Sequence, residues 1–273
     1  MTRTRTRVLV PVAILEGESV SLGLMNLLGT VDVTVLGYHV VPEQTPPDQA
    51  RLQYEDRATE ALEDLAEEFR EAGGDADHRL VFTPDRRRTI DRVADATGSR
   101  AYAITGATGA VERLLVPLTG DVAVDRILSF LADLVGVRPI GVTLFLATDE
   151  AADDAADDLL EAAAARLAER GIDARTTHVT GAPPFEALID AVADHDAIVM
   201  GERAPSLRSL VFGEEAERVA AESVGPVIVV RRVPDEAGAD AELDAAVEDD
   251  ARSTEERGES GSDDEERDDA PSG

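Results

Sequence analysis

Apolar residues along the chain form short continuous runs that alternate with stripes at helical spacing. The runs at residues 8–12 and 31–41 predict strands that are buried on both faces of a parallel sheet. An apolar stripe that ends at Gly73 and Gly74 predicts a helix; it consists of Ala58, Ala61, Leu62, Leu65, Ala66 and Phe69. Strands alternating with helices predict an α/β fold with a doubly wound parallel sheet and right-handed crossovers.

This pattern occurs twice. Residues 7–12 (RVLVPV) match residues 113–118 (RLLVPL), and residues 90–95 (IDRVAD) match residues 189–194 (IDAVAD). We therefore predict two tandem units, residues 1–111 and residues 112–233. Only the second unit continues, through a helical stretch that includes LVFG at 210–213, into the apolar run GPVIVV at 225–230. The first unit is predicted to lack its last helix and strand.

Further elements are predicted in each unit. A short helix over residues 19–28 has Ser19 or Ser21 as its cap. The second unit repeats the helical stripe at Ala156, Leu159, Leu160, Ala163, Ala164 and Leu167. Third strands are expected at 78–82 and 176–179, third helices at the two matching IDxVAD segments, and fourth strands at 101–105 and 197–200.

The charge balance is strongly acidic. The 273 residues carry 57 Asp and Glu against 26 basic residues, every one of them Arg, for a formal net charge of -31. Self-repulsion of this size destabilises a compact chain in dilute buffer, and molar salt screens it by shortening the Debye length to roughly 3 Å. We expect a protein adapted to a salt-rich cytoplasm, as in an extreme halophile. The same charge disfavours a nucleic-acid partner, because phosphate would repel it.

The C-terminal residues 234–273 differ in composition from the rest. Residues 235–273 contain 17 Asp or Glu, three Arg and almost no large apolar residue. Such a segment cannot bury enough surface to offset the entropy of ordering, so an acidic disordered tail is predicted. The apolar run that starts at Val8 contains Pro11, is ended by Glu16 and is followed by no cleavage site, so we read it as a strand and expect a soluble, cytoplasmic protein.

Together these segments resemble the universal stress protein family. The resemblance rests on the first strand VLVPV, on HVVP at 39–42, on IVMG at 198–201, and on the closing stretch from Gly213 to GPVIVV. It covers roughly residues 7–231 as a tandem pair and implies the UspA-type fold, which is that of the adenine nucleotide alpha hydrolase-like proteins. Members have a five-stranded parallel sheet, and many bind ATP without an obvious catalytic apparatus.

The residues at the family's nucleotide site depart from its pattern. An Asp that follows the first strand in ATP-binding members is replaced by Ala13 in the first unit and by Thr119 in the second. In the second unit's phosphate loop Gly201 and Gly213 match, but Ala204 replaces a Gly, the spacing is one residue short, and Glu214 stands where a hydroxyl is expected. The degenerate site comprises Thr119, Met200, Gly201, Ala204, Gly213 and Glu214, so ATP or another adenine nucleotide is expected to bind weakly or not at all.

Other candidate sites are weaker. Gly106 and Gly109 have the family's two-residue spacing, but the second half of that loop is missing, so loop structure explains them better than phosphate binding. The acidic start of the predicted helix near residue 156 suits the helix dipole and needs no catalytic role. His39, His78, His178 and His195 show no ligand spacing, so no metal and no cofactor are predicted. Arg86, Arg87 and Arg88 are interpreted as a solvated face.

These features favour a non-enzymatic stress-response or regulatory protein that acts by association. Two alternatives stay open: an ATP-binding switch or ATP-handling enzyme that uses the second unit's crevice, and a soluble regulatory partner of a membrane transporter, which rests on family analogy alone. In the family the fifth strand commonly pairs with its counterpart in another domain. Since the first unit lacks that strand, we expect a homodimer through Val227, Ile228, Val229 and Val230.

Overall fold

The structure, a computed structural model, describes residues 5–41, 47–118, 124–148, 154–202 and 225–232. The first half consists of β1 (Arg7–Val12), a 3-10 turn η1 (Ile14–Glu16), α1 (Leu22–Leu28), β2 (Asp32–Val40), α2 (Pro47–Glu71), β3 (Ala76–Thr83), α3 (Arg86–Thr97) and β4 (Ala101–Ile104). The second half consists of β5 (Arg113–Pro117), α4 (Val124–Val135), β6 (Gly141–Thr148), α5 (Asp154–Ala168), β7 (Ala174–Thr180), α6 (Pro184–Val192), β8 (Ala197–Gly201) and β9 (Val227–Val230).

Local sequence explains where several helices begin and end. Ser21 caps α1 by accepting a hydrogen bond from the backbone N–H of Leu24. Asp85 caps α3 in the same way through the N–H of Arg88, 3.0 Å from its carboxylate. Gly98 ends α3 with a left-handed φ of 64°, a conformation that disfavours residues with a side chain. Of the two caps predicted for the first helix, Ser21 is therefore the one used.

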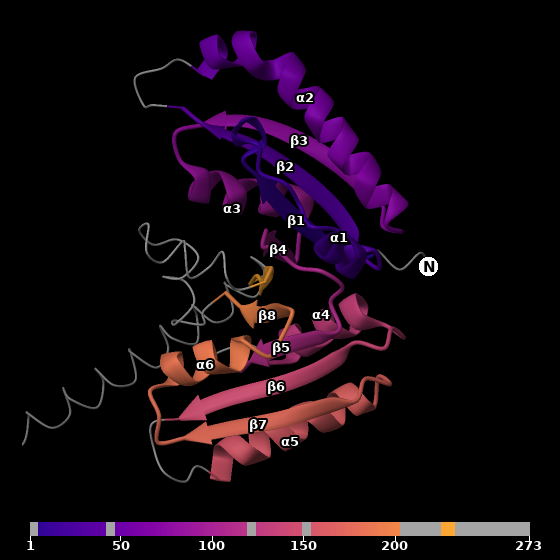
Figure 1. Cartoon of the computed structure of the whole chain (residues 1–273), viewed down its shortest axis with the longest axis vertical. Coiled ribbons are helices and arrows are strands. Elements are labelled where there is room, and N and C mark those ends of the chain that lie inside the picture. Colours follow the sequence, from indigo (N-terminus) through magenta and orange to yellow (C-terminus); the bar gives the residue numbers. More distant parts are fainter. Residues whose placement is uncertain (1–4, 42–46, 119–123, 149–153, 203–224, 233–273) are drawn as a thin grey trace, which may run out of the picture. The chain divides into compact units, whose positions relative to one another are not determined.

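All nine strands described belong to one sheet, in the order β3-β2-β1-β4-β9-β8-β5-β6-β7. Every neighbouring pair is parallel except β4 and β9. One face carries the core of α1, α2, α4 and α5, while α3 and α6 cover the other face (Figure 1). The predicted α/β class with doubly wound parallel strands is confirmed. The two sets of parallel strands are joined through β9 into a single mixed sheet.

The position of β9 corrects one expectation from the sequence. The sequence predicts that the first half lacks a strand equivalent to β9, and the described residues 105–112 contain none. The open edge predicted for β9 is wrong, because β9 pairs with β8 on one side and antiparallel with β4 on the other, where Ile228 lies opposite Ala103. Ile228 is fully buried, and the other three residues of β9 are at most 7 % exposed. The reason for expecting a homodimer through this strand therefore no longer holds. Whether the chain forms a homodimer is not settled by this pairing and stays a prediction.

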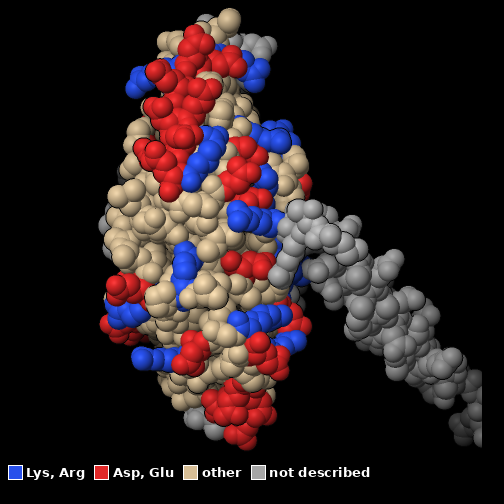
Figure 2. Space-filling model, turned by 90° about the vertical axis from the view of Figure 1, so that its right-hand side faces the viewer, with Lys and Arg blue, Asp and Glu red and all other residues tan. Residues whose placement is uncertain are grey.

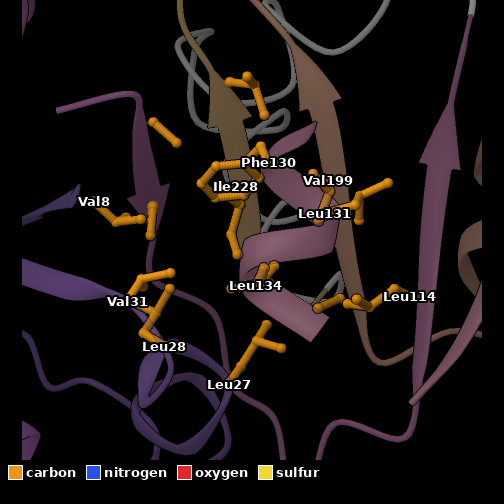
Figure 3. Packing of buried hydrophobic residues seen from close by; sticks show 14 of the residues in the cluster. Val8, Leu27, Leu28, Val31, Leu114, Phe130, Leu131, Leu134, Val199 and Ile228 are labelled. Carbon is orange, nitrogen blue, oxygen red and sulfur yellow. The ribbon is translucent and has the colours of Figure 1, made fainter. Parts of the chain in front are cut away.

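One apolar cluster continues across both halves. It includes Leu27 and Leu28 of α1, Phe130 and Leu134 of α4, and Ile228 of β9. Figure 3 shows Phe130 beside Ile228 and places Leu27, Leu28 and Leu134 in the same packed region. Helix α4 buries six of its 12 residues, and it joins the two halves because its apolar side meets both α1 and β9.

Arg138 reinforces this junction with polar contacts. Its guanidinium donates to the carbonyl oxygens of Asn26 (2.7 Å) and Leu27 (2.8 Å) at the end of α1, and to the carbonyl oxygen of Leu134 in α4. The Thr30 hydroxyl also donates to the Leu134 carbonyl, at 2.7 Å. The last carbonyl groups of a helix lack intrahelical partners, so the Arg138 guanidinium can bind the carboxyl ends of α1 and α4 together. Desolvation by burial lowers the pKa of Arg138.

No helix among the described residues is both long enough and apolar enough to span a membrane. The predicted acidic tail lies outside these residues, and so does the LVFG segment of the second half.

We predict that Ile228→Ala lowers the free energy of unfolding by about 2–5 kcal/mol, because it leaves a cavity between the two halves. Urea denaturation followed by circular dichroism measures the change. Val137→Ala is the control, since Val137 is fully exposed and its truncation should change stability by less than about 0.5 kcal/mol. Equal effects of the two substitutions would contradict the buried placement of β9.

Candidate functional site

The fold contains two places where a ligand of a doubly wound sheet would be expected. Such ligands bind beyond the carboxyl ends of the strands, where the chain turns from one side of the first strand to the other. In the first half, β1 pairs with β2 on one side and with β4 on the other. In the second half, β5 pairs with β6 and with β8. The two switch points are therefore the β1/β4 crevice and the β5/β8 crevice.

A carboxylate of the chain itself bridges the β1/β4 crevice. Glu18 accepts a hydrogen bond from the backbone N–H of Ala13, 2.6 Å away, just beyond β1. Its other oxygen accepts a hydrogen bond from the hydroxyl of Thr105, just beyond β4. Gly17, with a left-handed φ of 76°, turns the chain immediately before Glu18. Glu18 thus uses the donors that an anionic ligand at this switch point would need.

The loop that follows Thr105 also packs closely against neighbouring backbone. A Cβ atom on Gly106 would lie 2.7 Å from the backbone of Gly225 and Pro226, at the entry to β9. A Cβ atom on Gly23 of α1 would collide with the carbonyl oxygen of Gly109. Close backbone approach therefore accounts for the glycine at 106 without a phosphate group, in line with the interpretation made from the sequence.

The β5/β8 crevice is described only in part. Met200 and Gly201 end β8, and Gly201 lies opposite Val230 of β9. Met200 is 2 % exposed and belongs to the apolar core on the α3 and α6 face. The other members of the predicted nucleotide site lie outside the described residues: Thr119, Ala204, Gly213 and Glu214. Of the predicted set, the structure describes Met200 and Gly201, which are consecutive in the sequence, so the nucleotide site stays a prediction.

A charged cluster that sequence reasoning missed lies beside the end of β8 and β9. The buried Arg231 guanidinium forms an ion pair with Asp95 of α3 at 2.9 Å and donates to the Ser99 carbonyl oxygen at 3.4 Å. Burial raises the pKa of Asp91, and the nearby carboxylates of Glu202 and Asp95 act in the same direction, whereas Arg231 and Arg87 oppose them. No sequence motif indicates this cluster, because its members come from both halves.

Three of the histidines have contacts that the structure describes. His39 packs between the rings of Tyr54 and Phe82. His195 bonds the Ala191 carbonyl oxygen, and His178 lies 2.9 Å from Asp157. Among the residues that the structure describes, no group of three or more His, Cys, Asp or Glu side chains is arranged to hold a metal ion.

Acidic side chains dominate part of the surface. Figure 2 shows them gathered at the top of the view, where α2 lies. Within residues 51–71 of this helix the exposed acidic residues are Glu55, Asp56, Glu60, Glu63, Asp64, Glu67, Glu68 and Glu71. Glu55 and Glu67 form ion pairs with Arg51 and Arg70. Such exposed pairs contribute little to stability.

One part of the chain matches a known protein family by its sequence. Residues 110–231 match the model of the Universal stress protein family. No curated protein matches the chain. Among solved structures, a universal stress protein from Archaeoglobus fulgidus superposes with a TM-score of 0.60 at 18% identity, covering 84% of this chain and 97% of that one. This similarity shows that the nine-stranded arrangement is a universal stress protein fold.

A second Archaeoglobus fulgidus structure, the universal stress protein in complex with dAMP, aligns over 43% of this chain and 96% of its own, at 19% identity and a TM-score of 0.34.

For the charged cluster we predict that Asp91→Asn raises the melting temperature at pH 7. The folded state binds the Asp91 proton more tightly than the unfolded state, whose pKa is near 3.8, so the contribution of this group to stability is greatest below that pH and falls as pH rises through the folded pKa. Asn removes a disfavoured charge; partial exposure limits the gain to below about 1 kcal/mol. Differential scanning calorimetry at pH 4 and pH 7 tests this, with the exposed Asp190→Asn or Asp194→Asn as control. A lower melting temperature for Asp91→Asn at pH 7 would contradict the assignment.

Proposed function

We propose that the chain is a universal stress-type regulatory protein that acts by association and catalyses no reaction of a nucleotide. Its two crevices are degenerate relatives of an adenine nucleotide site. The match of residues 110–231 to the family model and the fold of the whole described chain support the family assignment. The first half is, on this proposal, a shortened copy of the second.

The observation that carries the proposal is the position of Glu18. Its carboxylate accepts hydrogen bonds from donors on both sides of the β1/β4 switch point. A nucleotide phosphate placed there would have to displace Glu18 and would meet its negative charge. In the second half, the replacements at Thr119, Ala204 and Glu214 act in the same direction, on sequence grounds.

A protein that acts by association needs a binding surface rather than a pocket. The net charge of -31 and the acidic face of α2 favour a solvated, monodisperse protein in molar salt, and we propose adaptation to a salt-rich cell as their cause. Partners of strongly anionic character, nucleic acid among them, fit this surface poorly.

We predict that the wild-type chain binds ATP, AMP and cyclic AMP with dissociation constants no tighter than about 1 mM, which corresponds to about -4 kcal/mol. Isothermal titration calorimetry in molar KCl measures this directly. Glu18→Ala frees the Ala13 N–H and the Thr105 hydroxyl and removes one negative charge, so AMP should bind at least tenfold more tightly than to the wild type.

Glu16→Ala is the matched control, since it removes the same charge from an exposed side chain two residues away. It should leave nucleotide binding unchanged. Micromolar binding of ATP by the wild type would overturn the proposal in favour of an ATP-binding switch. Equal affinity of the Glu16 and Glu18 variants would show that Glu18 does not block the crevice.

A further inference from the structure

Strand β6 carries two threonines, each of which contacts a histidine. Near its amino end, the Thr143 hydroxyl lies 2.9 Å from Nε2 of His195. At its carboxyl end, the Thr148 hydroxyl lies 3.0 Å from Nε2 of His178 on β7. The two pairs differ in what holds the second ring nitrogen. Nδ1 of His195 faces the backbone carbonyl oxygen of Ala191 at 2.7 Å, whereas Nδ1 of His178 faces the carboxylate of Asp157 at 2.9 Å.

The carboxylate gives the His178 pair a chemical capacity that the His195 pair lacks. The Asp157 carboxylate accepts a hydrogen bond from the Nδ1–H of His178, so the lone pair of Nε2 faces Thr148 and accepts a hydrogen bond from its hydroxyl. If Nε2 takes that proton fully, the resulting imidazolium lies beside a negative charge. The Ala191 carbonyl oxygen offers His195 only a dipole. Thr148, His178 and Asp157 thus form a hydrogen-bonded chain in which they are the nucleophile, the base and the orienting carboxylate.

The surroundings hold these groups in place and leave them accessible. The N–H of Gly181 donates to the Thr148 carbonyl oxygen at 3.0 Å, which ties the end of β6 to the residue after β7. The His178 side chain is 11 % exposed, while that of Asp157, in the first turn of α5, is 63 % exposed. Since β7 is the last strand of the sheet, this site between β6 and β7 is separate from both crevices.

We propose that Thr148 is an activated hydroxyl that accepts an acyl group from a thioester or another activated ester. Oγ1 of Thr148 attacks the carbonyl carbon while its proton passes to Nε2 of His178. The carbon–sulfur bond then breaks, and the thiolate leaves with that proton as a free thiol. The products are an ester on Thr148 and one thiol, with no change of oxidation state. This modification site does not rest on the function proposed above.

The test is acetylation of the full chain by a small acetyl thioester, followed by intact mass and peptide mapping. One acetyl group per chain is expected, on Thr148. His178→Gln should slow the reaction about 100-fold, as expected when a general base is lost, and Thr148→Val should abolish it. Thr148→Ser should react at a rate near that of the wild type, which separates loss of the hydroxyl from loss of the fold.

The other pair on β6 supplies matched controls. Thr143→Val and His195→Gln remove the same groups from a pair without a carboxylate, and Asp154→Asn removes a charge from the same turn of α5 as Asp157. All three should acetylate at the wild-type rate. Label spread over several surface hydroxyls, or equal rates in Thr143→Val and Thr148→Val, would overturn the proposal.

Asp157 is a positioning residue, and its test is the rate of acetylation compared with that of a conservative variant. Asp157→Asn should slow the acetylation of Thr148, because Nδ1 of His178 loses the carboxylate that orients the ring, and Asp157→Glu, which keeps a carboxylate, should restore much of the rate. A role of Asp157 in stability alone would change the melting temperature and leave the acetylation rate unchanged, and that result would contradict its assigned part.

Discussion

The antiparallel pairing of β9 with β4 is the contact on which the arrangement of the described chain depends. It supplies backbone partners for the last strand of each half and unites two sets of parallel strands in one sheet. Because Ile228 of β9 also packs against Phe130 of α4, the same strand anchors the shared apolar core. The last strand of the first half, β4, thus finds its second neighbour within the chain.

This closure also shapes the functional surfaces. Residues 105–112 connect β4 to β5, and Thr105 at the start of this connection donates to Glu18. The strand edges that remain within the described sheet are β3 and β7, and the latter carries His178.

Much of the fold follows from sequence periodicity, because strands β1, β2 and β4 are largely apolar runs and α2, α3, α5 and α6 show clear stripes. Helix α4 and strand β6 were not predicted, because no repeated sequence motif marks them, although one side of α4 is strongly apolar. The partner of β9 could not be foreseen, since antiparallel pairing between strands so far apart in the sequence leaves no local pattern. Glu18 and the Asp157–His178 contact were missed for a similar reason: each joins residues whose proximity only the tertiary fold creates.

Native-state hydrogen exchange of the backbone amides in β4 and β9 tests the central claim most directly. If β9 joins the halves into one cooperative unit, the amides of Tyr102 and Val229, which lie opposite each other, should exchange only through global unfolding, with the same opening free energy as the core amides of β1 and β5. Exchange of the β4 amides at a much lower free energy, with β5 still protected, would contradict the account, because it would show that the halves open independently of each other.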